Sequence, residues 1–417
     1  MQAHGFLRWS EKYFKTDMVY LAKGGFWLTL GYGGQIISGL ILTIALANLI
    51  SKEAYGTYQF VISVGAIIGG FTLSGMGTAL MRTVARGSKG TLQYAFKTQL
   101  TWSVGAVLAG GMLALYYFLN NNVELAIAFL VIGACVPFLS GFSLYRPYLE
   151  GMGFFRESTM LGIWRRPLPV ISVLFALLLT NDPIVLVLTY FLSQTISIGL
   201  LYRLIVRRYP ESSEPNQELL TYSKHLSVMG IVGIVANNVD KMLVFHFLGA
   251  APVAIYTLAQ LPSTHILKMF SLAGNLVFKK FARRDLSTLK EMIAHKIGVF
   301  SIATIAVVSV YIVAAPYIFK FVFPAYQEAV LLSQILILAV LLKPFMLYTQ
   351  VFASHGLKRA QYFIQISTTI IKLSLLLVLL PIYGLWGAVW TTLIASLYWG
   401  IIAAILFYSK KISDPQN

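Results

Sequence analysis

Long runs of apolar residues recur about twelve times along the chain, and short polar segments separate them. About 20 mostly apolar residues in an α-helix cross the hydrocarbon core of a bilayer, which is roughly 30 Å thick. The predicted spans cover residues 24–49, 58–80, 99–119, 124–144, 158–179, 183–202, 225–248, 253–276, 297–319, 328–350, 361–380 and 385–407. The pattern predicts an all-α integral membrane protein with about 12 transmembrane helices.

The composition fits a chain that has the bilayer as its solvent. Apolar residues make up 58% of the 417 residues, charged residues make up 11%, and the mean hydropathy is +0.75. A soluble domain of this size could not keep so much apolar surface away from water. The longest polar stretch, residues 203–224, is too short for a separate soluble domain.

The basic residues indicate how the chain is oriented. Of the 32 Lys and Arg residues, 26 flank the predicted inner ends of the spans, and only Lys52 and Lys320 flank the outer ends. Because cytoplasmic loops are rich in Lys and Arg, this bias predicts a multi-pass protein of the cell (inner) membrane with both termini in the cytoplasm. The net charge of +17 is spread over many short loops without an aromatic-interleaved basic patch, so nucleic acid is not an expected partner.

Two internal matches indicate a duplicated unit of six helices. Residues 50–58 align with residues 248–256 at an offset of 198, and the segment after Gly153 resembles the segment after Gly356 at an offset of 203. Because six is even, both copies start on the same side of the membrane and form parallel repeats. The predicted domains are a cytoplasmic amphipathic N-terminus at 1–23, a first six-helix lobe at 24–202, a cytoplasmic linker at 203–224, a second six-helix lobe at 225–408 and a cytoplasmic tail at 409–417.

Several segments near helix ends resemble one family of membrane proteins. They are Leu49-Ile-Ser-Lys-Glu-Ala-Tyr-Gly-Thr-Tyr58 with Leu73-Ser-Gly-Met-Gly77 and Arg82, Asn238-Val-Asp-Lys241 with Phe247-Leu-Gly249 and Ile255-Tyr256, and Leu380-Pro-Ile-Tyr-Gly-Leu-Trp-Gly-Ala388. Over nearly the whole chain, the sequence resembles polysaccharide-repeat-unit flippases, the Wzx-like branch of the multidrug/oligosaccharidyl-lipid/polysaccharide (MOP) exporter superfamily. The resemblance implies two pseudo-symmetric six-helix lobes around a central cavity that opens alternately inward and outward.

Ionisable and polar residues inside the spans are the first candidates for a binding site, because such residues rarely face lipid. In the eleventh span Gln361, Gln365, Thr368 and Lys372 form a polar stripe that ends near the membrane centre. We predict that this stripe lines a cavity with Lys372 at its apex; the alternative is hydrogen bonding between helices. In the seventh span Asn237, Asp240 and Lys241 share one helical face, either as a self-neutralising pair or as a cation or cargo site.

The other intramembrane bases lie nearer the cytoplasm. Lys268 and Lys343 are placed at the inner ends of spans eight and ten, where they either contact cargo or extend toward the inner surface. The candidate cavity entrance in the first lobe consists of Arg82, Arg86, Arg165 and Arg166, whose alternative role is to set the topology. Together these bases predict a site that attracts an anionic polyprenyl-pyrophosphate headgroup.

The predicted function is that of a flippase or exporter. It would move a lipid-linked oligosaccharide from the inner to the outer leaflet by alternating access, for cell-surface polysaccharide biosynthesis. A cation-coupled multidrug (MATE-like) exporter is the alternative, although spans one and two contain no Asp or Glu. A membrane polysaccharide polymerase or ligase is a third reading, but the six His residues are scattered, so no enzyme activity is expected.

The expected partners are the lipid bilayer, a polyprenyl-linked glycan and polysaccharide-assembly proteins, and the expected state is a monomer. No cofactor or metal is expected, because Cys135 is the only cysteine and no metal-binding spacing occurs. The sequence does not identify whether Na⁺ or H⁺ drives transport.

Overall fold

The computed structural model describes residues 18–88, 91–210, 217–281 and 286–409. All regular structure in these residues is helical, and ten helical segments in them are long and apolar enough to cross a membrane. The predicted all-α membrane fold is therefore confirmed, whereas the count of twelve spans stays a prediction. Most of the predicted N-terminal helix and tail, and residues 211–216 of the predicted linker, lie outside the described residues.

The chain forms two compact units. Unit 1 consists of Met1–Ala45 and Ile68–Ile231, and unit 2 of Leu46–Ile67 and Val232–Asn417, so three helices contribute residues to both units. These shared helices are α2 (Met18–Leu49), α3 (Lys52–Gly70) and α12 (Gln217–Leu248).

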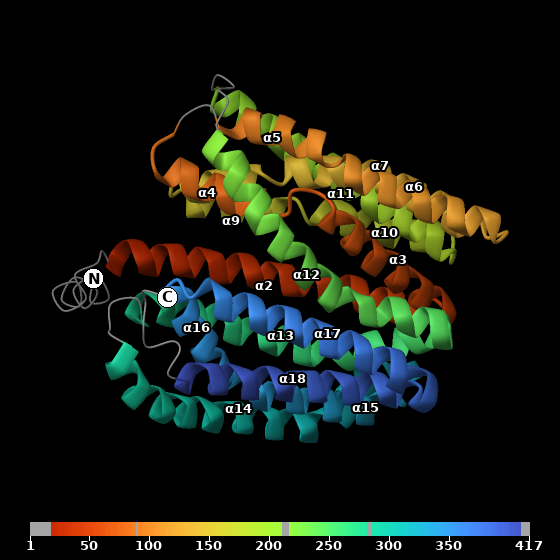
Figure 1. Cartoon of the computed structure of the whole chain (residues 1–417). Coiled ribbons are helices and arrows are strands. Elements are labelled where there is room, and N and C mark those ends of the chain that lie inside the picture. The colour runs from red at the N-terminus through yellow and green to blue at the C-terminus, as the bar shows by residue number, and fades with distance from the viewer. Residues whose placement is uncertain (1–17, 89–90, 211–216, 282–285, 410–417) are drawn as a thin grey trace. The chain divides into compact units, whose positions relative to one another are not determined.

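Unit 1 is built around a core of buried aromatic and aliphatic side chains that includes Met76, Tyr145 and Tyr148. Its remaining helices are α4 (Met76–Ala85), α5 (Thr91–Trp102), α6 (Val104–Leu119), α7 (Val123–Phe142), α8 (Tyr145–Gly151), α9 (Phe155–Trp164), α10 (Pro167–Leu177) and α11 (Pro183–Arg208). Helices α6 and α7 lie side by side as a hairpin (Figure 1).

Unit 2 has two core clusters, one around Val351 and Phe352 and the other around Ile337 and Val340. Its remaining helices are α13 (Ala250–Phe281), α14 (Leu286–Val322), α15 (Ala329–Leu336), α16 (Met346–Ser354), α17 (Lys358–Tyr383) and α18 (Leu385–Tyr408), with the 3-10 helices η1 (Pro324–Tyr326) and η2 (Ile337–Phe345). Helices α17 and α18 lie side by side in Figure 1.

Large apolar side chains remain exposed on the outside of both units. Leu178 is 79% exposed, Ile302 70% and Phe321 78%. In water this much uncovered apolar surface would cause association, whereas lipid tails cover it without cost. The chain is therefore a multi-pass membrane protein.

Some predicted spans are interrupted, and the local sequence explains each interruption. The predicted span 58–80 is divided between α3 and α4 by a turn in which the Thr72 hydroxyl donates to the Gly69 carbonyl at 2.8 Å. The predicted span 158–179 breaks between α9 and α10 at Pro167, whose ring lacks an N–H group and crowds the preceding turn. The break leaves Arg165 and Arg166 at a junction inside a membrane-spanning segment.

The duplication seen in the sequence recurs in the positions of the helices. Helices α3 and α13 start 198 residues apart, α9 and α17 start 203 apart, and α11 and α18 start 202 apart. Gly153 and Gly356 precede α9 and α17 at the same offset, and both have positive φ angles, 81° and 68°. Glycine adopts this left-handed conformation without a steric penalty, so the same turn starts the fifth span of each half.

The counterpart helices α3 and α13 meet directly inside unit 2. A Cβ atom added to Gly56 would lie 1.8 Å from the carbonyl oxygen of Ala250, so only glycine permits this approach of the two backbones.

The same end of α3 is held by polar contacts. Lys52, the first residue of α3, forms an ion pair with Glu328, and Asn48, near the end of the preceding α2, donates its Nδ2 to the Val322 carbonyl at 2.9 Å. Burial, reinforced by the carboxylates of Glu53 and Glu328, raises the pKa of the Tyr326 hydroxyl to about 12, so this phenol is neutral at physiological pH.

Candidate functional site

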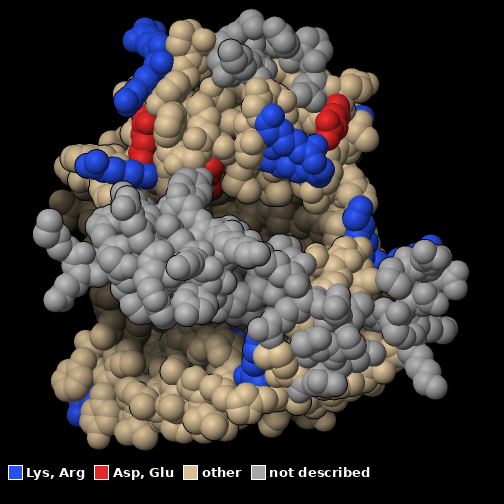
Figure 2. Space-filling view, turned by 90° about the vertical axis from the view of Figure 1, so that its left-hand side faces the viewer, with Lys and Arg blue, Asp and Glu red and all other residues tan. Residues whose placement is uncertain are grey.

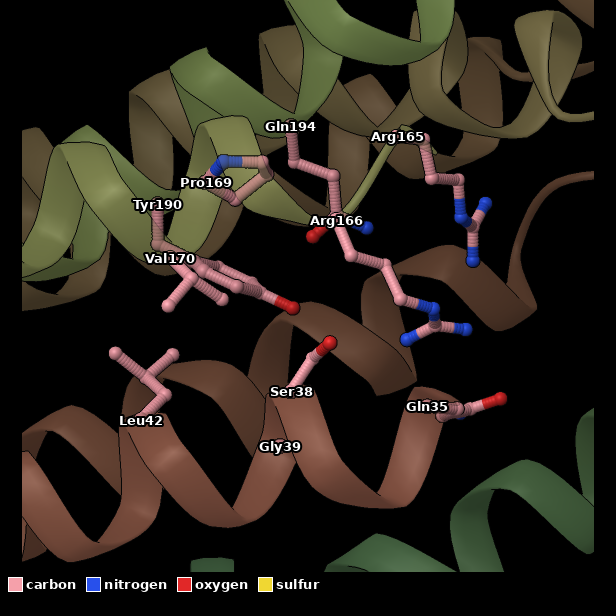
Figure 3. A pocket seen from close by; sticks show the side chains of 10 residues that line it. All are labelled: Gln35, Ser38, Gly39, Leu42, Arg165, Arg166, Pro169, Val170, Tyr190 and Gln194. Atoms are coloured by element: carbon pink, nitrogen blue, oxygen red, sulfur yellow. The ribbon is translucent and has the colours of Figure 1, made fainter. Parts of the chain in front are cut away.

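A pocket of about 210 Å³ in unit 1 contains two of the predicted arginines. We call it the arginine pocket, and its lining residues are Gln35, Ser38, Gly39, Leu42, Arg165, Arg166, Pro169, Val170, Tyr190 and Gln194. They come from α2, from the junction of α9 with α10, and from α11. Figure 3 shows the Arg166 guanidinium and the hydroxyls of Ser38 and Tyr190 extending into the space between these helices.

The charge of the arginine pocket is not compensated within it. No acidic residue lines the pocket, and within the described part of the chain neither Arg165 nor Arg166 forms an ion pair. The Nε–H group of Arg166 is buried without a hydrogen-bond partner. Because a buried donor without a partner is costly, this geometry favours an anionic or strongly hydrogen-bonding ligand.

The other two predicted entrance arginines lie elsewhere in unit 1. The guanidinium of Arg82 stacks 4.5 Å from the ring centroid of Tyr222, and Arg86 pairs with Glu218 at 3.0 Å. Arg82 and Arg86 are exposed, and neither lines the arginine pocket. The upper part of Figure 2 shows basic side chains next to acidic ones.

A second cavity, of about 290 Å³, lies within unit 2. We call it the lysine cavity. Its polar and aromatic lining consists of Asn237, Lys343, Thr368, Thr369, Lys372, Thr392, Ser396 and Trp399. The structure therefore brings together four residues that the sequence singled out, namely Asn237, Lys343, Thr368 and Lys372.

Lys372 is held by an acidic partner at the edge of this cavity. Its ammonium group lies 3.6 Å from the carboxylate of Asp240 and also donates to the carbonyl of Ala236. Asp240 is 2% exposed and accepts hydrogen bonds from the Tyr256 hydroxyl at 3.2 Å and from the Gln260 amide at 3.0 Å. This network connects α12, α13 and α17 and neutralises the charge of Lys372 inside unit 2.

Four predicted residues, the buried Asp240 among them, do not line the lysine cavity. Lys241 follows Asp240 on α12 and donates its backbone N–H to that carboxylate at 3.0 Å. Gln365 packs against α12, where a Cβ on Gly233 would meet its amide at 2.9 Å, and Lys268 is exposed on α13.

Sequence reasoning missed several lining residues. Gln35 and Gln194 are polar residues within apolar spans. Because such residues rarely face lipid, the same argument that singled out Gln365 identifies them as candidates. Tyr190 and Trp399 carry no such signal, because aromatic residues in spans usually pack or anchor.

Comparisons with known proteins agree with this fold. Residues 21–278 match the family described as polysaccharide biosynthesis protein. No curated protein matched the sequence significantly. The crystal structure of a MATE protein in complex with MaD5 is similar with a TM-score of 0.65 and 15% identity, covering 93% of this chain and 94% of that chain.

Two further solved structures have the same fold. A MOP superfamily transporter from Pyrococcus furiosus, whose description reports a binding pocket of reverse polarity, is similar with a TM-score of 0.59 and 15% identity over 93% of this chain and 95% of its own. An outward-facing multidrug resistance MATE transporter has a TM-score of 0.60 and 15% identity over 95% and 97% of the two chains.

These structural neighbours are transporters rather than enzymes, as the sequence predicted for this fold. The match to the polysaccharide biosynthesis protein family covers more than half of the chain. The chain belongs to the polysaccharide biosynthesis protein family and has the fold of MOP superfamily transporters.

Proposed function

We propose that the protein is an exporter that moves an anionic lipid-linked glycan from the inner to the outer leaflet of the cell membrane by alternating access. The cargo would be an oligosaccharide joined to a polyprenyl chain through a diphosphate, used in cell-surface polysaccharide biosynthesis. Membership of a polysaccharide biosynthesis family and a transporter fold support this proposal.

The single observation that carries the proposal is the arginine pocket. Two guanidinium groups at a helix junction inside a membrane-spanning segment have no acidic partner in their pocket. Charges at this depth cost several kcal/mol unless a ligand or water compensates them. A guanidinium binds phosphate oxygens through two parallel hydrogen bonds, so a diphosphate is the ligand class that matches this pair.

Export of cationic drugs fits these pockets less well. A drug cation needs an accessible acid, and the arginine pocket contains none. The buried acid of unit 2, Asp240, is already paired with Lys372. Both pockets therefore favour an anionic cargo.

Reconstituted transport tests the proposal. The protein is placed in vesicles with a polyprenyl diphosphate oligosaccharide that carries a fluorophore on the glycan, and dithionite added outside reports the fraction of label in the outer leaflet. We expect the label to equilibrate between leaflets only when the protein is present. Na⁺ and H⁺ gradients applied in separate vesicles identify the driving ion. Transport of a cationic dye without movement of the glycolipid would contradict the proposal.

We also propose that both termini lie in the cytoplasm, because the basic residues flank the predicted inner ends. The prediction is tested with single cysteines in a background where Cys135 is replaced by Ala. A thiol at Asn120, in the predicted outer connection between α6 and α7, should react with an impermeant maleimide in intact cells. A thiol at Arg207, near the end of α11, should react only after the cells are lysed, and the reverse result would overturn the topology.

A further inference from the structure

The arginine pocket and the lysine cavity occupy equivalent positions in the two halves of the chain. Helices α3 and α13 start 198 residues apart, and we apply this offset to the preceding helices α2 and α12, whose bounds lie 199 apart. The offset is 203 for the fifth span of each half and 202 for α11 and α18. With these offsets, seven of the ten residues that line the arginine pocket fall on residues that line the lysine cavity. Gly39 corresponds to Asn237 and Arg165 to Thr368.

Burial supports this alignment. On α2, Leu42 and Leu46 are buried, and their counterparts on α12 are the buried Asp240 and Val244. A shift by one residue would turn the helical face by about 100°. At an offset of 199 the counterparts of Leu42 and Leu46 would be the half-buried Lys241 and Phe245, so burial favours the offset of 198. The two pockets therefore lie at corresponding positions of the two halves of the chain.

The chemistry of the two pockets differs. Pro169 of the arginine pocket corresponds to Lys372, whose charge is compensated by Asp240. Trp399 of the lysine cavity corresponds to Ser197, whose hydroxyl donates to the Arg165 carbonyl at 2.8 Å. Among the described residues the ammonium of Lys343 forms no ion pair, and it lies over the Trp399 ring, 5.7 Å from the ring centroid.

The backbone around Lys343 is distorted where it lines the cavity. Residues Ile337–Phe345 form a 3-10 helix inside a membrane-spanning segment, and 3-10 runs longer than about 4 residues are uncommon. Pro344 contributes by removing an N–H group. Non-regular backbone at membrane depth is tolerated where it lines a polar cavity. The Thr368 hydroxyl, also in the lining, is buried without a hydrogen-bond partner.

We propose that the lysine cavity binds one acidic sugar ring, a pyranose that carries a carboxylate. The Trp399 indole would pack against the polarised C–H groups of a pyranose, and the Lys343 ammonium, which lies over the same indole, would pair with the carboxylate. The hydroxyl and amide groups of Thr368, Ser396 and Asn237 are suited to sugar hydroxyls. A cavity of about 290 Å³ is small for a ligand site and fits a single ring.

The assignment rests on the proposed glycan cargo, but binding can be measured without transport. Saturation-transfer NMR on the purified protein compares glucuronate with glucose as soluble probes. Lys343→Gln should weaken glucuronate binding by roughly tenfold and leave glucose binding unchanged, because only glucuronate loses a charge-assisted contact. Trp399→Leu should weaken both sugars by roughly 2- to 10-fold, whereas Trp399→Phe keeps an aromatic face and should bind both.

Two variants outside the cavity serve as matched controls. Trp390→Leu changes an exposed tryptophan on the same helix, and Lys320→Gln changes an exposed lysine at the end of α14, so both should bind like the unaltered protein. Thermal melting identifies any variant that fails to fold. If Trp399→Leu does not fold, the comparison of glucuronate with glucose binding in Lys343→Gln tests the assignment. Equal loss of both sugars in Lys343→Gln, unchanged binding in Trp399→Leu, or displacement of glucuronate by inorganic phosphate at equal concentration would overturn the assignment.

The outcomes separate this inference from the proposed function. If glucuronate binds as expected but the lipid-linked glycan does not move, the sugar site stands and the flippase proposal fails. If the glycolipid moves and the cavity variants bind both sugars normally, the flippase proposal stands and the sugar site is overturned.

Discussion

Replacing Arg165 and Arg166 together by Gln should abolish transport of the lipid-linked glycan while leaving the protein in the membrane. Each guanidinium can donate charge-assisted hydrogen bonds to a phosphate, and such bonds contribute about 1.5–3 kcal/mol each. Losing one from each arginine should weaken binding of the diphosphate roughly a hundredfold or more. The fold should persist because neither side chain forms an ion pair within the described residues, so the substitution leaves no charged partner buried.

The measurement is the rate of glycolipid movement in vesicles, divided by the amount of protein incorporated. Arg165→Lys with Arg166→Lys keeps the charge but loses the planar fork, so it should retain an intermediate rate. Arg86→Gln is the matched control, because Arg86 is exposed in the same unit and lies outside the pocket. Normal transport by the double Gln variant would remove the arginine pocket from the mechanism.

Replacing Lys372 by Met should destabilise the protein strongly. Asp240 is 2% exposed, and the substitution removes its closest cationic partner. Breaking a buried pair from one side costs about 3–5 kcal/mol, because the remaining charge is left without compensation. We expect a lower melting temperature in detergent and a lower abundance in the membrane.

The double variant Asp240→Asn with Lys372→Met should recover most of the lost stability, since the neutral amide can keep its hydrogen bonds to Tyr256 and Gln260. Lys320→Met, in the last turn of α14, should melt like the unaltered protein. The transport rate of the stable double variant then decides the role of Lys372. A normal rate assigns it to structure, and a lost rate assigns it to cargo. A Lys372→Met protein that melts normally would contradict the buried-pair argument.

The sequence alone determined the class of protein and the order of its membrane segments. Apolar runs of sufficient length must form helices in lipid, because every backbone group there needs a partner within the protein. The offsets of 198 and 203 also identified the duplication, since the turn glycines Gly153 and Gly356 are local features that sequence matching detects.

The tertiary structure decided which intramembrane charges face a partner and which face a pocket. Lys372 and Arg166 look alike in the sequence, because each is a base inside an apolar span. Contacts between helices far apart in the chain give Lys372 the carboxylate of Asp240, and the helix break at Pro167 places Arg166 in a pocket without an acid. Electrostatic compensation depends on distances of a few ångström between such helices, and the spacing of residues along a single helix does not contain them.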